Sequence, residues 1–79
     1  METVKMPQLS DDMKDALLCD WLVEEGADFS AGEALFEVET DKVVAQIEAD
    51  RSGTLVRHLV EAGDRVAYGP DLAEVDYHD

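Results

Sequence analysis

An internal repeat with an offset of 37 residues constrains this chain more than any other feature. Residues 23–39 read VEEGADFSAGEALFEVE and residues 60–76 read VEAGDRVAYGPDLAEVD, and seven of the 17 aligned positions are identical. Each copy carries two glycines six residues apart, which indicates turns at matching places because glycine reaches positive φ without a steric penalty. Two copies are too few for an open solenoid. The repeat therefore predicts one closed core with pseudo-twofold symmetry.

The segment between the two copies should have a counterpart in that symmetry. Residues 39–49 read ETDKVVAQIEA, and we expect them to be matched by the region where the two chain ends meet. Residues 2–5, ETVK, support this expectation because they precede residues 39–42, ETDK, by the same 37 residues.

Length and charge exclude several classes of protein. The 79 residues include 20 acidic and only 6 basic side chains, which gives a formal net charge of −14 at pH 7. A chain this short predicts one domain over residues 1–79 and rules out a two-domain enzyme with an interdomain cleft. The acidic excess argues against nucleic acid and anionic membranes, since both require clustered Lys and Arg. With no apolar stretch long enough to span a membrane and no secretion-signal pattern, we expect a soluble, acidic, intracellular single domain. We also expect the isolated domain to be monomeric.

Two segments have the alternation of half-buried strands. Residues 34–40 place Phe36 and other apolar residues on one face and Leu35 with two glutamates on the other, and residues 43–49 alternate in the same way. The intervening Asp41–Lys42 predicts a hairpin. Because these two residues are neither Asn-Gly nor Asp-Gly, we expect an ordinary type I turn.

Residues 16–25, ALLCDWLVEE, fit two kinds of element. Leu17, Leu18 and Trp21 have helical spacing, and the second copy repeats this arrangement. The short span and the glycine-bounded turns every six to ten residues instead favour a small sandwich or barrel of short strands. The pattern alone leaves helix and strand open.

No set of residues has the makeup of a catalytic or metal site. The two histidines, His58 and His78, lack further ligands, and the repeat aligns His58 with Trp21, which predicts a half-buried strand position. Cys19 has neither a CxxC partner nor basic neighbours, so it is interpreted as a packed thiol that cannot form an internal disulfide. We therefore predict no catalytic residues and no metal.

Lys42 differs from its surroundings because it lies at the tip of the predicted hairpin. An amine held outward on a short turn between two rigid strands is an accessible acceptor for an acylating enzyme. The alternative is a turn lysine that serves solubility. The hairpin pattern by itself does not decide between them.

About residues 4–76 resemble the lipoyl domain of the acyltransferase component of 2-oxo acid dehydrogenase complexes. The residues that carry the match are Met6, Pro7, Gln8, Leu9, Ser10, Met13, Trp21, Gly26, Gly32, Leu35, the run Glu37–Val44, Gly53, Val60, Gly63, Val66, Gly69 and Leu72. The resemblance implies an all-β fold, a flattened β-barrel or sandwich of two four-stranded antiparallel sheets with pseudo-twofold symmetry. It also implies that residues 16–25 are a strand.

The same resemblance implies that Lys42 carries lipoate in amide linkage, which changes the formal net charge from −14 to −15 because one positive charge is lost. The implied partners are a thiamine diphosphate-dependent 2-oxo acid decarboxylase, the acyltransferase core, dihydrolipoamide dehydrogenase and a lipoate-attaching enzyme. The domain would be a non-catalytic carrier within a longer acyltransferase chain. Its expected location is the cytoplasm, or the mitochondrial matrix in a eukaryote.

The resemblance also assigns roles around the lysine. Asp41 should position the turn and help the attaching enzyme recognise its acceptor, with Thr40 and Val43 flanking it and Glu39 adding acidic surface. The loop formed by Ser10, Asp11, Asp12, Met13 and Lys14 resembles the family loop that helps the decarboxylase choose its carrier. Ala16 departs from the glycine that the family often has, whereas the repeat-related position keeps Gly53.

Two alternatives share the expected architecture. A biotin carrier domain of a carboxylase also modifies a hairpin lysine, but that family places methionines on both sides of it, where this chain has Asp41 and Val43. An unmodified barrel used for assembly would have no need for the ETDK tetrapeptide at the turn.

Overall fold

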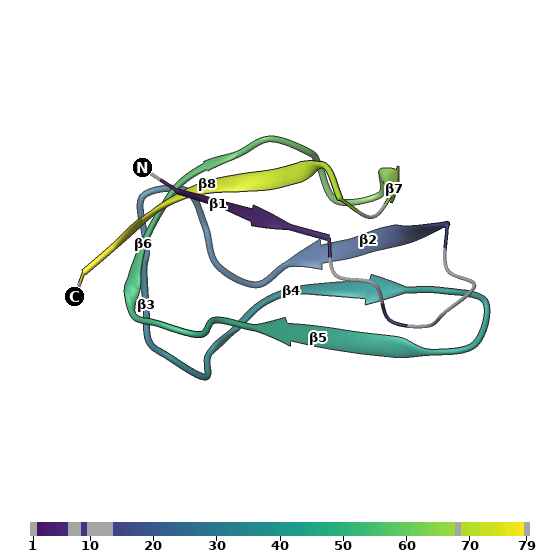
Figure 1. Ribbon diagram of the computed structural model, residues 1–79, viewed down its shortest axis with the longest axis horizontal. Coiled ribbons are helices and arrows are strands. Elements are labelled where there is room, and N and C mark those ends of the chain that lie inside the picture. Colours follow the sequence, from purple (N-terminus) through teal and green to yellow (C-terminus); the bar gives the residue numbers. More distant parts are fainter. Residues whose placement is uncertain (1, 7–8, 10–13, 68, 79) are drawn as a thin grey trace.

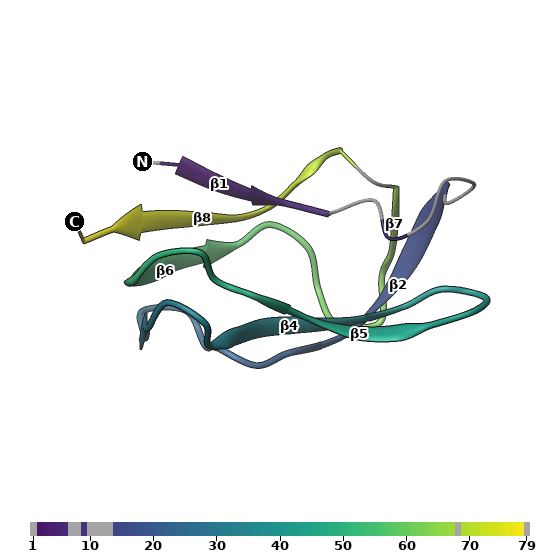
Figure 2. The same ribbon diagram turned by 60° about the horizontal axis from the view of Figure 1, so that its bottom comes forward.

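The computed structural model describes residues 2–6, 9, 14–67 and 69–78, and it consists of two four-stranded antiparallel sheets. One sheet has the order β1-β8-β6-β3 and the other the order β5-β4-β2-β7 (Figures 1 and 2). The strands are β1 (Glu2–Lys5), β2 (Asp15–Trp21), β3 (Asp28–Phe29), β4 (Ala34–Glu39), β5 (Val44–Glu48), β6 (Gly53–His58), β7 (Arg65–Ala67) and β8 (Asp71–Tyr77). The predicted fold class is confirmed.

The strand registers confirm the pseudo-twofold symmetry that the repeat predicts. Leu18 opposes Val38 across β2 and β4, and the repeat-related Leu55 opposes Val75 across β6 and β8. Both pairs of strands then shift register directly after these leucines. The turn glycines agree, because all four have positive φ, between 85° and 106°. Two copies of one supersecondary unit therefore close a single core.

The counterpart of the intervening segment is the N-terminal strand, but with a different alignment from the predicted one. Val4 of β1 opposes Ala73 of β8, just as Ile47 of β5 opposes Phe36 of β4. Thus β1 corresponds to β5, and the expected match of ETVK with ETDK is wrong. The pairing with the neighbouring strand, not the likeness of four letters, decides which residues correspond.

Residues 15–21 form a strand, so the helical alternative is wrong. Strand β2 lies in the middle of its sheet, bonded on one side to β4 and on the other to β7. Its register shift between Leu18 and Asp20 adds one residue to the alternation. That extra residue explains why Leu17, Leu18 and Trp21 show helical spacing along an extended strand.

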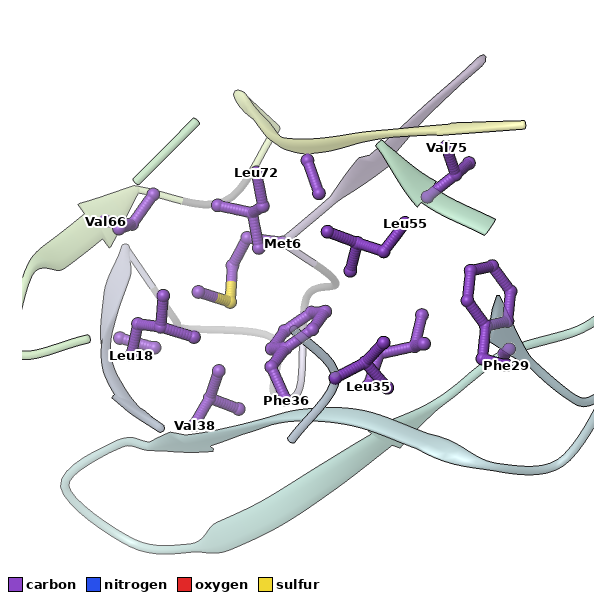
Figure 3. Close-up of a cluster of buried hydrophobic side chains, with 14 residues drawn as sticks. Met6, Leu18, Phe29, Leu35, Phe36, Val38, Leu55, Val66, Leu72 and Val75 are labelled. Atoms are coloured by element: carbon purple, nitrogen blue, oxygen red, sulfur yellow. The ribbon is translucent and has the colours of Figure 1, made fainter. Parts of the chain in front are cut away.

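Apolar side chains from both sheets form one core, with Phe36 near its centre (Figure 3). Phe36 is fully buried and Leu35 is 3% exposed, so the predicted outward position of Leu35 is wrong. A register shift between Ala34 and Phe36 lets two successive side chains turn inward. Burying a residue of this size contributes about 1.5–3 kcal/mol, and both leucine and phenylalanine gain this contribution.

The fold separates the predicted hairpin from the chain ends. In both views the turn between β4 and β5 lies at one end of the elongated molecule, and the N- and C-terminal ends lie together at the other (Figures 1 and 2). The molecule measures 34 × 20 × 18 Å. Among the described residues, no helix is long and apolar enough to cross a membrane.

Candidate lysine attachment site

Two paired strands hold the turn that carries Lys42. Strands β4 and β5 are bonded in continuous register from Phe36–Ile47 to Glu39–Val44, directly up to the turn. The backbone N–H of Thr40 donates to the carbonyl of Val43 at 2.8 Å, which closes the hairpin. Neither Asp41 nor Lys42 has positive φ, which excludes the primed hairpin turns and agrees with the predicted ordinary turn.

The hydroxyl of Thr40 organises the inside of the turn. Its Oγ1 accepts from the backbone N–H of Lys42 at 3.3 Å and from that of Val43 at 3.2 Å. Threonine hydroxyls stabilise turns in this way because the side chain mimics a backbone carbonyl. Thr40 was predicted only as a flanking residue, although a threonine followed by two turn residues is the sequence signal for this role. The hydrogen bonds orient the backbone that carries the amine.

The surface of the turn combines apolar and acidic side chains around an exposed lysine. Lys42 and Asp41 are exposed, while Val43 and Val44 keep 44% and 59% of their surface accessible. Glu39 is exposed at the end of β4. Among the described residues, this arrangement presents a primary amine on a short projection. Such an amine suits acylation by another enzyme, which supplies the activated acyl group and needs an accessible, oriented acceptor.

The electrostatic surroundings of this end are acidic. Hydrogen bonding to Asp15 at 2.7 Å, reinforced by the nearby charge of Asp41 and Glu39, raises the pKa of Arg65. Arg65 lies on β7, at the opposite edge of the sheet from β5. The predicted recognition roles of Asp41 and Glu39 remain predictions, and their exposure is what those roles require.

Some predicted residues lie beyond what the structure describes. Ser10, Asp11, Asp12 and Met13 of the predicted recognition loop are outside the described residues, and Lys14 is exposed just before β2. The role of the loop in partner choice therefore stays a prediction.

The structure explains why residue 16 is alanine, where the family often has glycine. Ala16 is fully buried opposite Val66, so its methyl group fills core space. At the repeat-related position, a Cβ on Gly53 would approach the carbonyl oxygen of Asp76 at 2.7 Å. The two copies differ because only one of them has room for a side chain at this point.

The aligned residues Trp21 and His58 meet face to face between the two copies. Their rings stack with centroids 4.1 Å apart and an interplanar angle of 10°. Trp21 Nε1–H donates to the carbonyl of Val60 at 3.0 Å, and His58 Nε2 bonds to the carbonyl of Val23 at 2.9 Å. These are the same contact repeated by the symmetry, which confirms the half-buried strand position predicted for His58. The pair has a structural role.

Metal binding and thiol chemistry at Cys19 find no support in the described residues. Within them, no group of three or more His, Cys, Asp and Glu side chains is placed to hold a metal ion. Partial burial, and then the charges of Glu39, Glu37 and Asp20, raise the pKa of the Cys19 thiol. A raised pKa keeps the thiol protonated and poorly nucleophilic, which agrees with its interpretation as a packed thiol.

The fold is a pair of four-stranded sheets with internal symmetry, and it places an exposed lysine at the tip of one hairpin. Residues 2–75 match the Biotin_lipoyl family, described as biotin-requiring enzyme, and the chain belongs to this family. The solved lipoyl domain of the 2-oxoglutarate dehydrogenase complex from Azotobacter vinelandii superposes with a TM-score of 0.81 at 25% identity, covering 98% of both chains.

The curated relatives include acyltransferase components of 2-oxo acid dehydrogenase complexes. The dihydrolipoyllysine-residue succinyltransferase component of the 2-oxoglutarate dehydrogenase complex from Staphylococcus saprophyticus is 35% identical over 75 residues, covering 95% of this chain and 18% of the relative. The dihydrolipoyllysine-residue acetyltransferase component of the pyruvate dehydrogenase complex from Zymomonas mobilis is 41% identical over 71 residues, covering 89% of this chain and 16% of the relative. The chain thus spans less than a fifth of each relative.

Proposed function

We propose that this domain is a lipoyl-lysine carrier in which lipoate is joined by an amide bond to Nζ of Lys42. The observation that carries the proposal is the geometry of the β4–β5 turn: an exposed lysine on a turn held by the Thr40 hydroxyl, at the opposite end from the chain termini. Membership of the Biotin_lipoyl family and the lipoyl names of the relatives support lipoate as the attached group.

The residues around Lys42 fit such a group. Strands β4 and β5 fix the base of the arm, and the position of the turn at one tip of the molecule lets the arm sweep outward without meeting its own domain (Figure 1). When bound, lipoate supplies a disulfide that accepts an acyl group together with two electrons. The protein contributes presentation and recognition and no catalytic side chain.

The proposed partners follow from this carrier role. We propose that a thiamine diphosphate-dependent 2-oxo acid decarboxylase loads the arm, an acyltransferase core unloads it and dihydrolipoamide dehydrogenase reoxidises it. The chain ends lie at the opposite end of the molecule from the lysine turn, and this arrangement supports the proposed order of reactions. A tether at the chain ends leaves the lipoyl-lysine arm free to visit each active site at high effective concentration. The domain would work as part of a longer acyltransferase chain, in the cytoplasm or the mitochondrial matrix.

A loading assay tests the carrier role. The lipoylated domain is incubated, in separate reactions, with four purified thiamine diphosphate enzymes and their substrates: decarboxylases with pyruvate, 2-oxoglutarate or a branched-chain 2-oxo acid, and an acetoin-cleaving enzyme with acetoin. The proposal expects one acyl group per domain with at least one pair of enzyme and substrate, seen by intact-mass spectrometry. A domain that accepts biotin instead of lipoate, or a lipoylated domain that none of these four enzymes acylates, would contradict it.

A further inference from the structure

An open groove of about 710 Å³ lies between the end of β2 and the segment that follows β6. Its lining includes Trp21, Glu25, His58, Val60, Glu61 and Asp64, and we call it the Trp21 groove. It is separate from the lysine turn, because β2 runs away from that turn (Figure 1) and Trp21 opposes Phe36, three residues before the end of β4. At about 3.3 Å per residue, Trp21 lies about 10 Å along the sheet from the last residue of β4.

Aromatic rings and apolar side chains form one part of the lining. The stacked rings of Trp21 and His58 are both half-buried, and each is held by a hydrogen bond to a backbone carbonyl. Leu59, which also lines the groove, is 41% exposed. Val60 is half-buried, whereas the repeat-related Val23 is only 5% exposed. The groove therefore leaves apolar surface accessible at a valine that the first copy of the repeat buries.

The charges that line the groove are negative. Glu25, Glu61 and Asp64 contribute carboxylates, and none of the described Lys and Arg residues lines it. Two of the carboxylates are held by the backbone: Glu25 accepts from the N–H of His58 at 2.8 Å, and Asp64 accepts from the N–H of Glu61 at 3.0 Å. A carboxylate has acceptor sites for more than one donor, so both can still bind a further N–H group.

Glu61 is the carboxylate of the groove that has no structural role. Its side chain is exposed and makes no hydrogen bond or ion pair with the part of the chain that the structure describes. The two nearest basic residues in the sequence interact elsewhere: Arg57 opposes Glu74 of β8, and Arg65 is bonded to Asp15 at 2.7 Å. The negative charge of the groove is therefore complementary to a cation supplied from outside the domain.

We propose that the Trp21 groove docks a partner protein through an arginine flanked by apolar side chains. A planar guanidinium packs against aromatic rings and bonds to carboxylates in a fork, and the groove offers two aromatic rings and three carboxylates. The flanking apolar side chains would cover Leu59 and Val60. A partner bound there leaves the lysine turn uncovered. This site goes beyond the carrier function proposed above and does not depend on it.

A short peptide and its uncharged isostere test the site on the unmodified domain. The probe is acetyl-Leu-Arg-Leu-amide, and the control is the same tripeptide with citrulline, which has the shape of arginine without its charge. Trp21 is the only tryptophan of the chain, so its indole N–H gives a single resonance in an amide correlation spectrum that also follows the backbone. In about 0.15 M salt the Debye length is about 8 Å, which screens the general attraction of a chain with net charge −14.

The site predicts saturable shifts that are confined to the groove. The arginine peptide should shift the Trp21 indole resonance and the amides of residues 58–64, and the citrulline peptide should bind about tenfold more weakly because it cannot form charge-assisted hydrogen bonds. Equal affinity for the two peptides would overturn the proposal. Shifts that centre on the lysine turn, or that spread over the whole domain, would also overturn it.

Two glutamates related by the repeat provide matched variants. Glu61→Gln removes a charge from the groove, and Glu24→Gln removes the same charge from the repeat-related exposed position outside it. Glu61→Gln should raise the Kd of the arginine peptide by about two- to fivefold, and Glu24→Gln should leave it at the wild-type value. Equal Kd values for the two variants would overturn the groove as the site and leave the carrier function intact. Failure to lipoylate Lys42 would instead refute the carrier function and not this site.

Discussion

The hydroxyl of Thr40 makes the sharpest prediction about the lysine turn. Replacing Thr40 by valine keeps the shape and the branched Cβ but removes the acceptor of the hydrogen bonds from the N–H groups of Lys42 and Val43, at 3.3 and 3.2 Å. Each such bond contributes about 0.5–1.5 kcal/mol when formed, and an exposed turn lies at the low end of that range. The expected loss is therefore about 1 kcal/mol of turn stability, a factor of about five in the ratio of ordered to disordered turn.

Two measurements detect this loss of turn stability. Amide hydrogen exchange of Lys42 and Val43 should become about fivefold faster in Thr40→Val, because exchange follows the ratio of disordered to ordered turn. The initial rate of lipoylation should fall by up to the same factor, because the enzyme finds the ordered turn less often. The melting temperature should fall by no more than about 4–8 °C. Thr40→Ser keeps the hydroxyl and should restore most of both properties.

A matched substitution distinguishes an effect on the lysine turn from an effect on the stability of the whole domain. Thr54→Val also removes a hydroxyl with two hydrogen bonds, to Asp28 and His78, but on the sheet that does not carry Lys42. It should leave lipoylation at the wild-type rate. If Thr40→Val were lipoylated as fast as the wild type, or if Thr54→Val slowed the reaction equally, the argument that the Thr40 hydroxyl orients the acceptor would be refuted.

The remaining predictions concern packing in the core and the loss of stability at low pH. Gly53→Ala should destabilise the domain by about 1–3 kcal/mol in urea unfolding, because the new Cβ would approach the Asp76 carbonyl oxygen at 2.7 Å; Ala16→Gly, at the repeat-related buried position, should cost about 1 kcal/mol. A smaller cost for Gly53→Ala than for Ala16→Gly would contradict the packing argument. Hydrogen bonds from Lys5 and Thr3 lower the pKa of Asp71 below its ordinary 3.8, so its contribution is complete above that value and is lost as pH falls through the lower folded pKa. The stability difference between wild type and Asp71→Asn should accordingly shrink below about pH 4 in acid titrations, and a difference that stayed constant with pH would contradict this assignment.

The repeat made most of the fold predictable, and register shifts account for the places where periodicity failed. Matching glycines and leucines predicted two related units, because a duplicated supersecondary unit must repeat its turns and core contacts. Periodicity failed where the strands shift register: the shift beside Leu18 gave β2 a helical spacing, and the shift before Phe36 turned Leu35 inward. A single extra residue in a strand has no signature in composition or alternation.

The candidate site was predictable at Lys42 and less so around it. The alternating residues on either side of Asp41–Lys42 indicated a hairpin, which the structure confirms. The surroundings of the turn were not visible in the sequence, because Leu17 and Arg65 lie far from Lys42 along the chain and are brought to its sheet only by strand pairing.

The most direct test of the central claim is the mass of the domain after exposure to a lipoate-attaching enzyme, measured for wild type, Lys42→Ala and Lys14→Ala. Both lysines are exposed, so accessibility alone does not distinguish them. The carrier function predicts a gain of one lipoyl group on wild type and on Lys14→Ala, and no gain on Lys42→Ala. An unmodified wild-type domain, or a lipoyl group that persists in Lys42→Ala, would contradict it.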